Sequence, residues 1–355
     1  MPKVLKSVLK GAGIVIGAVL IFVVVFIGYL SITEYNPGEV EPLEIAGEGT
    51  KSLSLGESVK FISFNIGYGG LGKDADFFMD GGKNVVTGDE ALVYENLGGI
   101  KKIIESSGAD FALLQEVDVN SSRTFGINEA EFLTEGQSVS FAHALNYSCN
   151  YVPFPFPPIG RVNSGLLTLS ASEMESAERY ALPCPFSWPV RVANLKRCIL
   201  VSYHDIEGTD AKLAVINLHL EAYDDGEGKT AQTKMLVEIM ENEYKKGNYV
   251  VAGGDFNQSF ADALELYPVQ GEGYWTPGTL ESDSLPEGWS FVYDLSSPTC
   301  RSLDRPLDSS DENFQYYFID GFIVSPNVEV ISVNTLDGGF IYSDHNPVTM
   351  EIKLK

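Results

Sequence analysis

The sequence predicts an α/β (α+β) fold in which β-sheets pack together and helices cover their outer faces. It also predicts a transmembrane helix on the N-terminal side of this fold. Three observations predict it. Short apolar runs rich in Val, Ile, Phe and Leu recur along the chain and are typical of buried strands. Stretches with apolar residues at helical spacing lie between some of these runs. One long run without any charge lies near the N-terminus.

Residues 11–30 form this uncharged run, which predicts a transmembrane helix. At about 1.5 Å per residue, such a helix spans the hydrocarbon layer of a membrane. Lys3, Lys6 and Lys10 precede the run and glutamates follow it, so residues 1–10 are expected in the cytoplasm and the rest of the chain outside it. A cleaved signal peptide is the alternative. The run is longer than the usual signal peptide core and lacks a clear cleavage site, so we expect an uncleaved membrane anchor.

Residues 31–58 are expected to be a flexible linker. They contain Pro37 and Pro42, several glycines, six glutamates and few bulky apolar residues, a composition that does not build a core. The folded domain is then expected at 59–355.

Within this domain the periodicity predicts two helices, at 90–106 and 229–243. It also predicts strands, which are, in order, 59–65, 111–117, 165–170, 199–204, 213–220, 249–253, 317–324 and 349–354. Long loops rich in Gly, Pro and Asp separate them and are expected to carry the binding determinants.

The charge balance bears on the choice of substrate. The chain has 24 Lys and Arg against 49 Asp and Glu, a formal charge of -25, which repels polyanions and disfavours duplex nucleic acid as a partner. No C-x-x-C pair supports a zinc knuckle. Disulfide formation is left open for the four cysteines, which are Cys149, Cys184, Cys198 and Cys300.

Polar residues follow several of the predicted strands, at positions where the packing of a hydrophobic core does not explain them. Each alone has a structural explanation, as a turn residue, a solvated edge or a satisfied core histidine. Together they indicate side chains projecting towards one face. The set consists of Asn65, Glu116, His219, Asp255, Asn257, Asp320, Asp344 and His345.

The segments that carry this set are SFNIGYG, LLQEV, INLHL, GGDFN, FIDGF and SDHNPV, in that order. Over roughly residues 59–354 they resemble the motifs of the endonuclease/exonuclease/phosphatase superfamily, which has the deoxyribonuclease I-like fold. The resemblance implies a four-layered α/β sandwich, with two mixed β-sheets packed face to face and helices on the outside. It also implies a divalent-metal-dependent phosphoesterase.

The resemblance further implies roles for the site residues. Glu116 is the expected ligand of Mg²⁺, with Mn²⁺ or Ca²⁺ as alternatives, because hard cations prefer oxygen ligands. Asn65 and Asp344 would assist at the metal or the phosphate. Asn257 and His219 would donate hydrogen bonds to phosphoryl oxygens as these gain charge.

Asp320 is expected to hold His345 in one tautomer. This dyad would either take the proton of the attacking water or stabilise the phosphoryl oxygens, and Asp255 is the competing candidate for the base. The sequence leaves this choice open.

Two further features have simple structural interpretations. Arg123 either meets a phosphate or, more simply, pairs with a carboxylate. The proline-rich segment 154–158 is either a rigid loop or part of the substrate pocket.

The function expected from these observations is hydrolysis of a small or lipid-linked phosphoester by in-line attack of water, outside the membrane. A surface-anchored nuclease acting on DNA or RNA and a catalytically silent binding protein of the same fold are the alternatives. The sequence indicates neither the substrate nor the oligomeric state.

Overall fold

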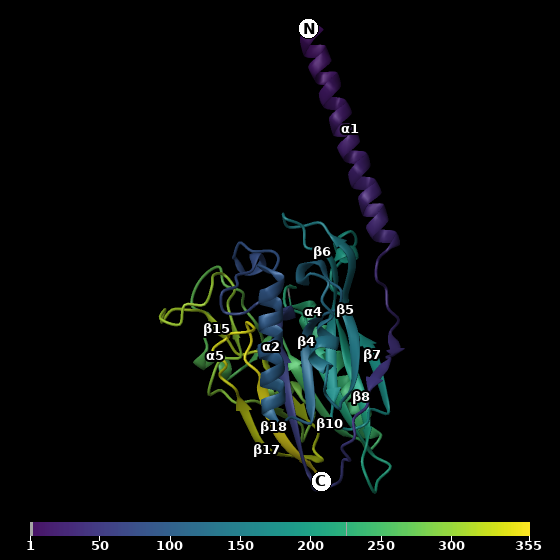
Figure 1. Ribbon diagram of the computed structural model, residues 1–355, viewed down its shortest axis with the longest axis vertical. Coiled ribbons are helices and arrows are strands. Elements are labelled where there is room, and N and C mark those ends of the chain that lie inside the picture. Colours follow the sequence, from purple (N-terminus) through teal and green to yellow (C-terminus); the bar gives the residue numbers. More distant parts are fainter. Residues whose placement is uncertain (1–2, 225) are drawn as a thin grey trace.

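The computed structural model describes residues 3–224 and 226–355 and confirms the predicted fold class. The first two residues of the expected cytoplasmic segment 1–10 lie outside the described residues. Two seven-stranded sheets pack face to face and form the body of the domain (Figure 1).

In the first sheet β9 and β10 are parallel and the other neighbours antiparallel. Its strands are, in spatial order, β1 (Val40–Pro42), β7 (Ser176–Ala181), β8 (Cys198–Asp205), β9 (Lys212–His219), β10 (Tyr249–Asp255), β16 (Asp320–Val324) and β13 (Ser290–Val292).

In the second sheet only the neighbours β3 and β4 are parallel, so both sheets are mixed. Its strands are, in spatial order, β17 (Val328–Thr335), β18 (Val348–Leu354), β3 (Ser58–Asn65), β4 (Phe111–Asp118), β6 (Gly160–Ser170), β5 (Ser140–Val152) and β2 (Ile45–Gly47). Two small ribbons pair β11 (Gln258–Phe260) with β12 (Gly278–Leu280) and β14 (Cys300–Arg301) with β15 (Tyr316–Tyr317).

The alternation of side chains along the strands produces four layers. On β3, Phe61 faces the first sheet and packs in a cluster with Val215 and Phe322, whereas its neighbour Ile62 faces outwards. Burying both faces of a strand removes most of its apolar surface from water, at about 25 cal/mol per Å². The sheets are therefore held together by a continuous apolar layer.

Helices cover the two outer faces. α2 (Glu90–Ser107) and α3 (Glu129–Thr134) pack on the second sheet, and α4 (Glu227–Lys245) packs on the first; α5 (Ala263–Leu266) is a single turn. α2 begins where the Asp89 side chain accepts a hydrogen bond from the Leu92 amide, and it ends at Gly108, whose φ of 63° suits glycine. Both long helices lie close to the predicted ranges.

The strand registers bring the motif residues to one edge of the sandwich. Asp255, at the end of β10, is paired with His219 of β9 on one side and with Asp320 of β16 on the other. In the second sheet Asn65 is paired with Gln115, the neighbour of Glu116. These residues therefore lie together, at an edge of the sandwich that both sheets form.

Strands β5, β7 and β17 were not predicted. None of them is a continuous buried run: buried and half-buried positions alternate along most of β5, β7 has several half-buried positions, and β17 has several exposed ones. The predicted strand 317–324 is divided into β15 and β16, with Phe318 and Ile319 between them.

The structure differs from the expected flexible linker at 31–58. Within it β1 pairs with β7 of the first sheet and β2 pairs with β5 of the second. Edge strands need few apolar residues because main-chain hydrogen bonds hold them, and here Leu43 and Ile45 add half-buried contacts. Composition alone therefore misjudged this segment, which runs along both sheets.

Helix α1 (Lys3–Ile32) projects from the domain (Figure 1). Its length and apolar composition are sufficient to cross a membrane, and it is almost entirely exposed. A signal sequence near the N-terminus can also be this long and apolar. The expected membrane anchor therefore stays a prediction.

Candidate active site

Glu116 is aimed into the site by an irregularity of its strand. On β4, Leu114 pairs with Leu167 and Val117 pairs with Gly165, so two β4 residues lie opposite one residue of β6. Glu116 takes a φ of 56°, which is unusual for a residue with a side chain. Such a bulge redirects a side chain and is common next to active sites, so it makes Glu116 a candidate functional residue.

Asn65 links the two sheets at their common edge. Its amide Nδ2 donates to Glu116 Oε1 at 3.2 Å and to Asp255 Oδ2 at 3.0 Å. Its Oδ1 accepts a hydrogen bond from the Gly67 amide. The side chain is buried, so these bonds fix Glu116 relative to Asp255.

Asp255 is positioned by the glycine before it. Gly254 has a φ of 152°, and a Cβ there would lie 2.0 Å from the Leu218 carbonyl oxygen of the parallel strand β9. Only glycine allows the two backbones to approach this closely. The Asp255 carboxylate then lies 3.4 Å from His219 Nε2 and accepts a hydrogen bond from the Asn257 amide.

Asp320 and His345 form the expected pair. His345 Nδ1 lies 2.8 Å from Asp320 Oδ2, and His345 Nε2 lies 3.8 Å from Asp255 Oδ2. All three side chains are buried. The imidazole therefore lies between two carboxylates. Asp320 is hydrogen-bonded to Nδ1, and Asp255 lies near Nε2.

Burial perturbs the acid-base properties of this group. It raises the pKa of Asp255 to about 7, and the charge of Asp320 adds to this effect. Burial alone lowers the pKa of His345, but the Asp320 carboxylate and the Cys300 thiol raise it well above its ordinary value. Burial, Arg197 and His345 together lower the pKa of His219 well below its ordinary value, so His219 is neutral.

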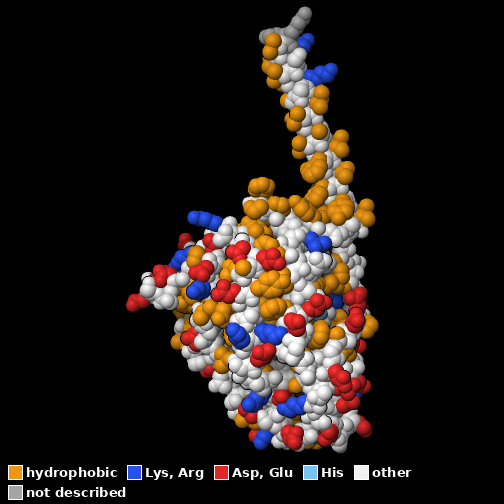
Figure 2. Space-filling view, in the orientation of Figure 1, with side chains coloured by type: hydrophobic (Ala, Val, Ile, Leu, Met, Phe, Trp, Pro, Cys, Tyr) orange, Lys and Arg blue, Asp and Glu red, His pale blue; other side chains and the backbone are white. Residues whose placement is uncertain are grey.

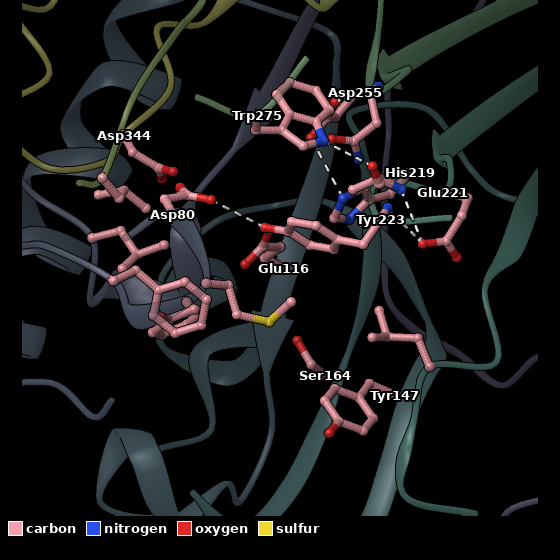
Figure 3. A pocket seen from close by; sticks show the side chains of 18 of the residues that line it. Asp80, Glu116, Tyr147, Ser164, His219, Glu221, Tyr223, Asp255, Trp275 and Asp344 are labelled. Carbon is pink, nitrogen blue, oxygen red and sulfur yellow. Dashed lines mark hydrogen bonds and ion pairs between the residues drawn. The ribbon is translucent and has the colours of Figure 1, made fainter. Parts of the chain in front are cut away.

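A second group of carboxylates lines the same cavity. Burial raises the pKa of Asp344 to about 6, and neighbouring Glu116 adds to the effect while His345 opposes it. Burial also raises the pKa of Asp80 to about 7, with Asp344 and Glu116 adding to it. Figure 3 shows Asp80, Glu116 and Asp344 together on one side of the cavity, with Asp80 hydrogen-bonded to Tyr223.

These residues fit a divalent metal. Carboxylates that repel one another are the ligands that a hard cation prefers, because the cation removes the repulsion. Two sets of ligand atoms also lie close enough to hold an ion, one formed by Asp255, Asp320 and His345 and one by Cys300, Asp344 and His345. The second set, with a thiol and an imidazole, suits softer ions than Mg²⁺.

Asn257 has its side chain partly engaged. Its Nδ2 donates to the Leu220 carbonyl at 2.9 Å, and its φ of 50° is in the left-handed region. One amide hydrogen remains for a ligand, and Asn257 lines the cavity.

Arg123 pairs with Asp118, as the simpler interpretation expected, although this carboxylate is buried rather than at the surface. Two nitrogens of the guanidinium bond the two carboxylate oxygens at 2.9 and 2.8 Å. The guanidinium also stacks on Tyr68, 3.6 Å from the ring centre. This arrangement fixes one wall of the cavity.

The cavity has a volume of about 520 Å³, within the usual range for small-molecule sites. Of the predicted site residues, it is lined by Glu116, His219, Asp255, Asn257, Asp344 and His345. Asn65 and Asp320 lie behind this wall and hold its members in place.

The sequence did not single out Asp80, Tyr223 or Arg301, all of which line the cavity. They come from long loops and a two-residue strand, where no motif or periodicity marks a position. The four cysteines are free of disulfides.

Comparisons with known proteins identify the family and the fold. A family model described as Endonuclease/Exonuclease/phosphatase family matches residues 62–345, well over half of the chain. No curated protein matched the sequence.

Among solved structures, an endonuclease/exonuclease/phosphatase from Beutenbergia cavernae is similar with a TM-score of 0.57 and 16% identity, covering 84% of this chain and 72% of its own. One from Bacteroides vulgatus has a TM-score of 0.53 and 16% identity, covering 84% and 100%. A humanized D. rerio TDP2 has a TM-score of 0.50 and 14% identity, covering 83% and 99%. At these identities the likeness shows the fold.

Proposed function

Because the chain belongs to the endonuclease/exonuclease/phosphatase family, we propose that it is a Mg²⁺-dependent phosphoesterase. We further propose that it acts outside the membrane to which α1 anchors it, on a small or lipid-linked phosphate ester. Members of this family are typically hydrolases of phosphoester bonds.

One observation carries the proposal. Asn65 bonds both Glu116 and Asp255, and His345 lies between Asp255 and Asp320, so the expected metal-binding and acid-base residues form one connected network. A protein that only bound a ligand would not need a buried carboxylate and a buried histidine with such perturbed pKa values at the same place.

The residues have distinct tasks in this proposal. Glu116 and Asp344 would hold Mg²⁺, with Asn65 fixing the Glu116 carboxylate, and the ion would supply positive charge to the phosphoryl group. His345, oriented by Asp320, or Asp255 accepts the proton of the attacking water. Both candidates for the base stay open, because His345 would accept the proton only in its neutral form and Asp255, 3.8 Å away, only as a carboxylate.

Two side chains would stabilise the charge that develops on the phosphoryl oxygens. Asn257 has one amide hydrogen free, and His219, whose Nε2 lies 3.4 Å from Asp255 Oδ2, lines the same cavity. Donors that are fixed before the reaction act mainly on the transition state.

The membrane anchor and the negative charge of the chain both favour a small or lipid-linked substrate over nucleic acid. A tethered enzyme meets membrane substrates at high effective concentration. A formal charge of -25 opposes the approach of nucleic acid.

The proposal is tested on the full chain purified in detergent. Hydrolysis of soluble phosphomonoesters, phosphodiesters, phospholipids, plasmid DNA and single strands is measured with Mg²⁺ and with a chelator. His345→Ala should lower turnover by at least about 10²-fold. His204→Gln is the matched control, because His204 is a buried histidine bonded to Ser172 and Ser202 outside the cavity.

Hydrolysis of nucleic acid alone would favour the surface nuclease instead. Absence of metal-dependent hydrolysis across the whole panel would contradict the proposal and favour a silent binding protein.

A further inference from the structure

We propose that the end of the domain beside α1 contacts the membrane, and that a membrane lipid with a phosphoester head group enters the active site from there. This inference rests on the proposed function and specifies its substrate class. We call this end the apolar tip and define it as Tyr151, Phe154, Phe156, Trp188 and Val190.

The apolar tip exposes large side chains to an unusual degree. Phe156 is 91% exposed, Phe154 73%, Trp188 60% and Val190 58%. They come from two loops, 153–159 and 182–197. Figure 2 shows hydrophobic side chains gathered at the top of the domain around the base of the helix. Apolar patches of this kind on an acidic protein mark interaction sites, because exposing them to water costs free energy.

Contacts with α1 determine how deep the apolar tip would lie in a membrane. Trp188 Nε1 donates to Ser31 Oγ at 3.0 Å, directly after the apolar run that ends at Leu30. The ring of Tyr151 lies 6.0 Å from that of Phe26. Phe26 is four residues inside the run, or about 6 Å at 1.5 Å per residue. If α1 spans a bilayer, Trp188 is therefore at the interface that tryptophan prefers and Tyr151 is at the edge of the hydrocarbon.

The same contacts connect α1 to the wall of the cavity. Leu30 packs in one cluster with Val152, Ile159 and Val192. Val152 and Ile159 also line the cavity that contains His345. The membrane anchor and the active site therefore share a single apolar cluster.

The cavity has two chemically different ends. Glu116, Asp344 and His345 form the polar end, whereas Phe154, exposed at the apolar tip, lines the same cavity. In Figure 3, Tyr147 lies well away from Asp344 and Asp255, on the far side of the cavity. Tyr147 packs against the cluster that contains Leu30. A phosphate head group joined to a hydrocarbon chain has this same division, so the head would lie at the polar end and the chain would run towards the membrane.

The charges of the cavity wall support a lipid rather than a polyanion. Of the three arginines that line the cavity, Arg123 pairs with Asp118 and Arg197 pairs with Glu221. Arg301 is buried and donates to backbone carbonyl groups. No row of free cations is available along the described wall for successive phosphates of a nucleic acid.

The first test compares two esters with the same reacting group. The full chain is reconstituted in phosphatidylcholine vesicles and given p-nitrophenyl methyl phosphate or a p-nitrophenyl phosphodiester carrying a sixteen-carbon chain. We expect kcat/KM to be at least about tenfold higher for the long-chain ester, because methylene groups leave water on binding. The double variant Phe156→Ser and Trp188→Ser should reduce this ratio at least about threefold.

The matched control is Ile331→Ser. Ile331 is 45% exposed, but it lies on β17, near the end of the domain opposite α1 (Figure 1). This variant should keep the full ratio. Equal kcat/KM for the two esters, or a ratio that the double variant does not change, would overturn the inference while leaving the phosphoesterase itself intact. No hydrolysis of either ester by a chain that hydrolyses another phosphoester would also overturn the inference, whereas no hydrolysis of any phosphoester would contradict the proposed function, and the inference with it.

The second test does not depend on activity. Among the three tryptophans, Trp275 and Trp289 are replaced by Phe, so that only Trp188 fluoresces. In vesicles whose acyl chains carry bromine near the head groups, the emission of Trp188 should be strongly quenched relative to unbrominated vesicles. Identical emission in both kinds of vesicle would overturn the proposed membrane contact.

Discussion

Replacing Asp320 with asparagine tests how the acid-base pair works. The change keeps the shape of the side chain but removes the charge that His345 Nδ1 contacts at 2.8 Å. Both side chains are buried, at 1% and 6% exposure, so water does not substitute for the lost partner. Asparagine can also present its amide to the ring, which would favour the wrong tautomer.

The magnitude follows from this single contact. A hydrogen bond to a charged group contributes about 1.5 to 3 kcal/mol, and each 1.36 kcal/mol corresponds to about tenfold in rate. Asp320→Asn should therefore lower kcat by about 10- to 100-fold. His345→Ala should lower it at least as much, since it removes the group that Asp320 orients.

The double variant gives the sharper result. If Asp320 acts through His345, adding Asp320→Asn to His345→Ala should change kcat little, because the contact is already lost. The assay is the Mg²⁺-dependent hydrolysis of a soluble chromogenic phosphodiester. Urea unfolding of each variant checks the fold. Asp262→Asn is the control, since Asp262 bonds Tyr293 and does not line the cavity. An equal loss in both backgrounds would refute the reasoning.

Three further predictions follow from other parts of the molecule. Glu116→Gln removes a carboxylate ligand and should raise the Mg²⁺ concentration for half-maximal activity at least about tenfold, so an unchanged Mg²⁺ titration would contradict its role. Burial lowers the pKa of His204 from 6.5 to about 4, so the unfolded chain binds the extra proton and stability falls by about 3 kcal/mol as the pH drops from about 6.5 to 4. His204→Gln should lose this part of the acid sensitivity, as measured by urea unfolding at pH 7.5 and 4.5. A fragment that begins at residue 58 should be less stable than one that begins at 34, by about 2 kcal/mol, because it lacks the half-buried Leu43 and Ile45; equal urea midpoints would contradict this.

Much of the fold was predictable because the strands of the sandwich are buried on both faces. A strand such as β8 (Cys198–Asp205) has nearly every residue buried, and this produces the continuous apolar run that is visible in the sequence. β17 has several exposed positions and β1 is three residues long, so neither gives a comparable signal. Edge strands depend on main-chain hydrogen bonds, which side-chain patterns do not encode.

The site was predictable where a strand carries the residue to the edge. Asp255 and Asp320 lie opposite each other because β10 and β16 are paired in that register. Asp80 belongs to a long loop, and its approach to Glu116 depends on how that loop folds over the sandwich. No local pattern specifies such an approach, because it results from contacts between segments far apart in the chain.

The pairing of the segment after α1 with both sheets has a consequence for kinetics. β1 and β2 attach this segment along the body of the domain, so the cavity has little freedom to swing away from α1. If α1 anchors the protein in a membrane, an enzyme held in this way would search for its substrate by lateral diffusion in the plane of one leaflet. Its rate should then follow the mole fraction of substrate in the bilayer and stay constant when substrate-free vesicles are added, because the lipid around each molecule is unchanged.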